Sequence, residues 1–158
     1  MTSPGLAVAR SGATGLVLTR TFAAPPALVF AALTQPDLLR RWHGAHGWRL
    51  TECEVDLRAG GAWRFVSLGP DGAEMAMSGV FREVVPPVRI VQTEVHRGWT
   101  DGAALVTTEL AETGGRTAMT VTVEYSSPEV REQALRSPMR RGAGEAYDRL
   151  ETLLAQEK

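Results

Sequence analysis

The chain has 158 residues, of which 44% are hydrophobic and 22% are charged, with a formal net charge of −1 and a pI near 6.3. This balance is typical of a single globular domain with its own hydrophobic core. It argues against a nucleic-acid-binding protein, whose affinity depends on neutralising many phosphates. A local basic patch is the alternative to a solvated arginine surface, which is the simpler interpretation of Arg40, Arg41, Arg136, Arg140 and Arg141.

Cysteine usage and hydropathy exclude further classes. Cys53 is the only cysteine, so an intramolecular disulfide and a multi-cysteine zinc site are both excluded. No apolar run reaches the roughly 20 residues of a membrane span, and the first residues lack the pattern of a signal peptide. We therefore expect a cytoplasmic protein without nucleic-acid or membrane partners. Residues 1–14 are expected to form a flexible tail, and residues 15–156 a single domain.

The first elements after this tail are one strand and two short helices. Residues 15–22 mix apolar and β-branched side chains, which predicts a strand. Pro25 and Pro26 favour the start of a short helix, since the first turn needs no intrahelical N–H donor. Pro36 opens a second short helix, which is expected to end before Gly44.

Six strands connected as a meander are predicted between residues 48 and 125. Glycine and proline clusters separate them, because these residues supply the backbone conformations of tight turns. The turns are expected at residues 59–61, 69–72, 86–87, 98–102 and 114–115. The last strand shows the clearest alternation, and its apolar residues should face the covered side of a sheet; they are Met119, Val121, Val123 and Tyr125.

The last twenty residues carry a helical pattern. Apolar residues recur at intervals of three and four with charged residues between them, which predicts one long helix with an apolar stripe. Ser127 and Ser137 are each followed by proline and predict two helix starts, with a break between residues 136 and 138. A helix of this kind should cover the sheet in an α+β architecture, and its small residues can leave space beneath it.

Several segments together resemble one known family. They are LTRTFAAPPALVFAALTQPDLLRRWHG, VDLRAGGAWRF, LGPDG followed by SGVFREVVPPVRIVQTE, and GAGEAYDRLETLL, and they cover nearly all of residues 15–155. The chain is similar to relatives of the activator of the ninety-kilodalton heat-shock protein ATPase, within the START-like SRPBCC superfamily. The resemblance implies a helix-grip fold, in which a curved antiparallel sheet of about seven strands grips the C-terminal helix around a cavity. Two positions depart from the family pattern near the expected cavity mouth, His43 after Trp42 and Pro138 before Met139.

Our first hypothesis is a small-molecule-binding protein, a monomer or homodimer that holds a hydrophobic or aromatic ligand between sheet and helix. Methionine and aromatic side chains adapt to irregular apolar ligands, although the same residues can fill a core. The helix offers alanines where leucines would fill the space. The residues expected to contact the ligand are Trp42, Trp63, Phe65, Met75, Met77, Phe81, Val121, Val123, Met139, Ala143 and Ala146.

Two alternatives stay open. An enzyme similar to the polyketide cyclases and aromatases of the superfamily needs a charged residue deep in the cavity, with Arg20, Arg64 and Glu83 as candidates. A chaperone-associated interaction module needs an exposed apolar patch on the outer face of the sheet. The polar outer residues of the last strand argue against such a patch on that strand.

The sequence gives little support for metal binding or nucleophilic catalysis. His43 and His46 offer at most two metal ligands, so we interpret them as exposed loop histidines and expect no metal and no cofactor. His96 has no obvious partner in the sequence. No serine lies in a nucleophile elbow, and Cys53 is expected to be a buried, inert thiol.

Carboxylates in the strands are a further set of candidates. Glu83, Glu94 and Glu109 all lie in predicted strands, and one of them can point inward. An inward carboxylate with a raised pKa would permit general acid or base chemistry. The sequence does not distinguish among the three.

Overall fold

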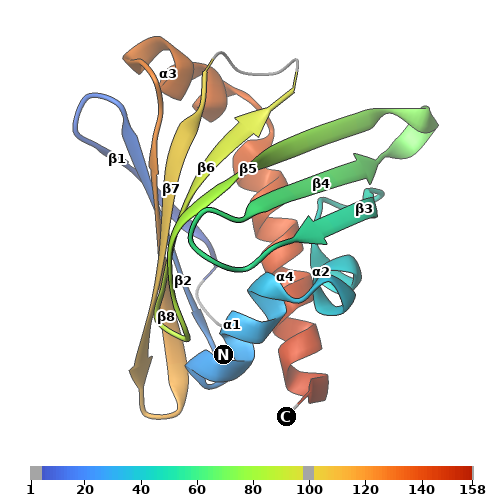
Figure 1. The fold of residues 1–158 in the computed structure, drawn as a ribbon, viewed down its shortest axis with the longest axis vertical. Coiled ribbons are helices and arrows are strands. Elements are labelled where there is room, and N and C mark those ends of the chain that lie inside the picture. The colour runs from blue at the N-terminus through green and yellow to red at the C-terminus, as the bar shows by residue number, and fades with distance from the viewer. Residues whose placement is uncertain (1–4, 98–101, 158) are drawn as a thin grey trace.

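The computed structural model describes residues 5–97 and 102–157. Within these residues the chain forms an eight-stranded antiparallel sheet, four α-helices and one 3-10 turn (Figure 1). The elements are β1 (Ala7–Ser11), β2 (Gly15–Phe22), α1 (Pro26–Thr34), α2 (Pro36–Trp42), β3 (Arg49–Val55), β4 (Ala62–Leu68), η1 (Pro70–Gly72), β5 (Glu74–Val85), β6 (Arg89–His96), β7 (Ala104–Thr113), β8 (Arg116–Glu124), α3 (Pro128–Arg136) and α4 (Met139–Glu157).

The sheet is strongly curved. Its strand order is β1-β2-β8-β7-β6-β5-β4-β3, so the predicted meander is joined to β2 through β8. Register shifts between Leu50 and Glu52 and between Phe81 and Glu83 mark irregularities of the kind that bend a strand. In Figure 1, β7 and β8 run upright while β3, β4 and β5 swing to the right, and α4 passes behind β4 and β5.

Strand β1 lies in the segment that we expected to be a tail. Residues 7–11 pair with β2 in antiparallel register. Arg10 forms an ion pair with Glu132 of α3 at 2.8 Å, and Arg140 of α4 donates a hydrogen bond to the carbonyl of Val8 at 3.1 Å. Residues 7–11 are therefore a paired strand, and the sheet has one strand more than the seven expected. The prediction missed β1 because its residues are largely exposed and lack a clear apolar alternation.

The concave face of the sheet and the C-terminal half of α4 enclose the main core. Leu150, Leu153 and Leu154 are each at most 4% exposed. They belong to one cluster with apolar residues from the sheet and from α1 and α2, among them Leu18, Phe22, Val29, Leu39, Met119 and Val121. The predicted helix-grip arrangement is confirmed.

The two predicted helix starts are also confirmed. The Ser127 hydroxyl accepts a hydrogen bond from the Val130 backbone N–H at 3.1 Å, as expected of an N-cap. Helix α3 ends at Arg136, and the Ser137 hydroxyl accepts a hydrogen bond from the Met139 N–H at 3.2 Å. Among the described residues, no helix has the length and apolar character that a membrane-spanning segment requires.

Candidate functional site

Helix α4 changes character along its length. Its C-terminal half carries the buried leucines, whereas its first turns present Gly142, Ala143 and Ala146. This first half begins beside α3, near the ends of β6 and β8 (Figure 1). Several large apolar side chains of the sheet and of α4 are packed against the core yet partly exposed; they are Phe65, Met77, Val123, Tyr125, Met139 and Tyr147.

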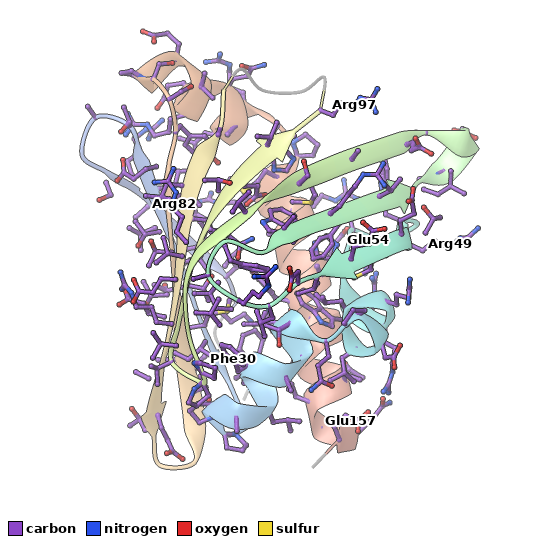
Figure 2. All side chains as sticks on the ribbon, viewed as in Figure 1. Phe30, Arg49, Glu54, Arg82, Arg97 and Glu157 are labelled. Carbon is purple, nitrogen blue, oxygen red and sulfur yellow. The ribbon has the colours of Figure 1, made fainter. Side chains whose placement is uncertain are left out.

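The strand register brings three of the site's side chains together across β4, β5 and β6. Phe65 lies opposite Met77, and Met77 lies opposite His96. Because side chains alternate along a strand, Glu94 projects from the same face of β6 as His96. In Figure 2, Arg97 at the end of β6 and Arg49 on β3 extend away from the body of the protein, so these neighbouring charges lie outside the site.

Glu94 and His96 are hydrogen-bonded to each other on this face. The His96 Nε2 atom lies 2.7 Å from a carboxylate oxygen of Glu94, and the side chains of His96 and Glu94 are only 21% and 19% exposed, respectively. From the sequence, His96 had no obvious partner and the inward carboxylate was unassigned. The available signal was their spacing of two residues on a strand, which places both on one face.

His43 is the second polar group of the site. Its ring lies 5.1 Å from the ring of Phe65 and 5.6 Å from that of Trp42. Burial lowers the pKa of His43 from 6.5 to about 4; Glu94 opposes this shift, while His96 and Arg149 add to it. His43 is therefore neutral at pH 7. Its Nδ1 atom is buried and has no hydrogen-bond partner among the described residues.

The prediction of two exposed loop histidines is correct for one of them only. The His46 side chain is 71% exposed and lies 3.5 Å from the Glu145 carboxylate of α4. His43, in contrast, packs among aromatic rings. The sequence could not distinguish the two, because both stand beside glycine in the same short segment.

Helices α2 and α4 hold His43 in place. The Trp42 indole N–H donates to the carbonyl of Ala32 at 2.8 Å, and its ring stacks on Tyr147 with centroids 6.0 Å apart. The Arg149 guanidinium donates to the carbonyls of Trp42 and Gly44, each at 3.1 Å. The backbone on both sides of His43 is therefore fixed to α4.

The Glu94 carboxylate affects the pKa of two tyrosines. Burial raises the pKa of Tyr125 and of Tyr147 to about 12, and the Glu94 carboxylate contributes to both shifts. Glu94 shares its strand face with His96, which lies opposite the partly buried Met77, and its side chain is 19% exposed. The inward strand carboxylate is therefore Glu94, whereas Glu83 and Glu109 are 46% and 52% exposed and pair with Arg89.

The three charged residues suggested for an enzyme lie in two different environments. The Arg64 and Glu83 side chains are 42% and 46% exposed, and each forms an ion pair at the surface. The Arg20 side chain is buried, but it pairs with Asp148 of α4 at 2.7 Å. Arg64 and Glu83 therefore lie at the surface, whereas Arg20 is buried, as the enzyme alternative requires.

The structure separates the eleven predicted contact residues into groups. Partly accessible are Phe65, Met77, Val123, Met139 and Ala143. Buried in the core are Trp42, Trp63, Phe81, Val121 and Ala146, and Met75 is 39% exposed. Their contacts with a ligand stay a prediction.

Two surface pockets lie apart from the predicted residues. The larger has a volume of about 570 Å³ and is an open, mostly apolar groove between the α1–α2 corner, the β3–β4 loop and Pro86–Pro87. The smaller, of about 260 Å³, lies between β1 and the α3–α4 corner. Neither is lined by any of the eleven residues. Among residues 5–97 and 102–157, no three His, Cys, Asp or Glu side chains gather as a metal site would require.

A curved antiparallel sheet around a C-terminal helix defines a helix-grip protein of the START-like class. The family model for Activator of Hsp90 ATPase homolog 1-like protein matches residues 23–155. The chain therefore belongs to this family.

Solved structures agree with this assignment. A protein from Rhodobacter sphaeroides is 35% identical with a TM-score of 0.92, over 97% of this chain and 99% of that one. A protein from Nitrosomonas europaea is 31% identical with a TM-score of 0.82, over 95% and 99% of the two chains. An Hsp90 activator from Plasmodium falciparum is 22% identical with a TM-score of 0.63, over 90% and 96%, and shares the fold. No curated protein sequence gives a significant match.

Proposed function

We propose that the protein binds a small hydrophobic or aromatic ligand between β4–β6 and the first half of α4. One observation carries this proposal: large apolar side chains stay partly accessible around an inward Glu94–His96 pair, beneath a helix segment built of small residues. A protein that needed only a packed core would favour leucine at Ala143, as α4 has at its later inward positions. Binding sites for small molecules typically combine an apolar lining with a few polar groups.

Burial of apolar surface supplies the affinity. At about 25 cal/mol per Å², a ligand that buries roughly 200 Å² of apolar surface gains about 5 kcal/mol. Phe65, Met77 and Met139 offer aromatic and flexible thioether surfaces that adapt to a flat molecule. The polar groups then orient the ligand.

The experiment is a fluorescence titration with the neutral apolar probe N-phenyl-1-naphthylamine. Ala143→Leu places a large side chain at the accessible helix position and is expected to weaken probe binding at least tenfold. Ala155→Leu is the matched control, because Ala155 is exposed on the same helix. Equal affinities of Ala143→Leu and wild type would overturn the proposal.

A chaperone-associated module is the second candidate function. The observation that favours it is the apolar groove of about 570 Å³, which includes the exposed Leu57 and Pro86–Pro87. Val85 and Val88 flank it and are 42% and 44% exposed. The Plasmodium falciparum relative is described as an Hsp90 activator. This function predicts that the protein changes the ATP turnover of a purified Hsp90-type chaperone and that Leu57→Asp abolishes the effect; unchanged turnover would remove the candidate.

A further inference from the structure

The polar end of the proposed site indicates which ligands it accepts. One oxygen of Glu94 lies 2.7 Å from His96 Nε2, and this is the only hydrogen bond that the described residues make with the carboxylate. The Glu94 side chain is 19% exposed, so the carboxylate is not fully enclosed by the protein. An accessible carboxylate oxygen on the inner face of a sheet is an acceptor for a ligand donor.

His43 adds an unsatisfied polar atom to the same site. Its Nδ1 is buried without a partner among the described residues, and its ring packs against Phe65. Buried polar atoms are nearly always hydrogen-bonded, because leaving one unpaired costs free energy. A polar ligand group or an ordered water that reaches His43 would remove this cost.

The charges around the site disfavour an anionic ligand. Glu94 is the acidic group that faces it, and His96 is engaged with Glu94. Arg149 donates to the carbonyls of Trp42 and Gly44. Arg20 pairs with Asp148 through its Nη1 atom, while its buried Nε has no partner among the described residues. A ligand carboxylate would meet the negative charge of Glu94, and these two arginines of the described residues already hold partners on the protein.

We infer that the site selects a planar apolar molecule that carries a neutral O–H or N–H donor, which Glu94 accepts, and discriminates against the corresponding carboxylate. This inference rests on the proposed binding function and names the chemistry of its ligand. Apolar contacts with Phe65, Met77 and Tyr147 hold the rings. The hydrogen bond to an ionised carboxylate then fixes their orientation, because such bonds are stronger than neutral ones.

Three probes of similar shape test the inference: 1-naphthol, naphthalene and 1-naphthoate, each titrated calorimetrically at pH 7. The wild-type protein is expected to bind 1-naphthol about tenfold more tightly than naphthalene, and to bind 1-naphthoate most weakly. Glu94→Gln keeps the shape of the side chain and removes its charge. It is expected to lower the preference for 1-naphthol over 1-naphthoate at least tenfold. Glu83→Gln, on an exposed glutamate of the neighbouring strand, should leave all three affinities unchanged.

The outcomes separate the ligand chemistry from the binding function. Ala143→Leu could weaken the binding of all three probes while 1-naphthoate binds wild type as tightly as 1-naphthol. That result would support the proposed binding site and show that the inference about its ligand is wrong. An unchanged preference in Glu94→Gln would also show that the inference is wrong. If no probe binds, or if Ala143→Leu leaves the affinity for the probes unchanged, both the proposed function and the inference are wrong. The ranking in the wild-type protein is decisive even if Glu94→Gln does not fold.

Discussion

Single residues decide how closely the strands of the site approach one another, and Gly79 is the clearest case. Trp63 on β4 reaches across β5 at Gly79, and its indole N–H donates to the carbonyl of Thr93 on β6 at 3.1 Å. A Cβ atom at position 79 would lie 1.8 Å from that carbonyl oxygen and 2.7 Å from the Trp63 indole nitrogen. Only glycine leaves room for this contact.

Gly79→Ala is therefore expected to lower the free energy of unfolding by about 3 kcal/mol, in the upper range for overpacked sites. Urea unfolding followed by tryptophan fluorescence measures the change. Gly144→Ala is the control, because a Cβ there meets nothing within 4 Å and a helix interior favours alanine over glycine by about 1 kcal/mol. A Gly79→Ala protein as stable as wild type would contradict the crossing of Trp63 over β5.

The burial of His43 predicts how the stability of the folded protein depends on pH. Burial holds the folded-state pKa of His43 at about 4, below the ordinary value of 6.5. As the pH falls below 6.5, the unfolded chain binds a proton that the folded protein does not, so stability is lost. Between pH 7 and pH 5 this loss amounts to about 2 kcal/mol.

Chemical unfolding at several pH values checks this prediction. His43→Gln should remove most of the loss between pH 7 and pH 5, whereas His46→Gln, at an exposed position, should keep it. The window lies above the range in which carboxyl groups ordinarily titrate. Identical pH profiles for His43→Gln and wild type would show that His43 is not buried in the folded protein.

Among the elements, α4 shows best how packing varies along one helix. Ala146 is 6% exposed and belongs to the core cluster, whereas Ala143 is partly exposed three residues earlier. Ala146→Leu should cost about 2 kcal/mol through overpacking. Ala143→Leu should change stability by less than about 0.5 kcal/mol, as is usual where no contact is broken. Thermal unfolding of the two proteins tests this, and equal costs would mean that the helix is packed uniformly.

The same elements show what the sequence could and could not predict. Strong periodicity and turn residues were sufficient for β2 to β8 and for α4, because burial of one face imposes the pattern. Strand β1 could not be predicted, since it is held by backbone pairing and by arginine contacts that leave no apolar alternation. The Glu94–His96 pair was missed for a related reason: a spacing of two residues indicates a shared face but does not indicate which face is covered.

Across the whole molecule, contacts between distant segments position α4 over the sheet. Arg20 of β2 pairs with Asp148, and the backbone N–H of Ala23 donates to Glu151. Arg149 anchors the segment that carries His43. Because these contacts fix the helix from both sides, the space beneath its first turns depends on the small side chains there.

Methyl NMR of methionine tests the location of the ligand most directly. The chain has 5 methionines, so selective labelling of their methyl groups gives few, separable signals. Met77 and Met139 are partly buried in the proposed site, whereas Met119 is 1% exposed and clusters with the leucines of the later turns of α4. Addition of 1-naphthol is predicted to shift the methyl signals of Met77 and Met139 and to leave the Met119 signal unchanged. Binding of 1-naphthol without any shift of Met77 and Met139 would place the ligand elsewhere and contradict the proposed site.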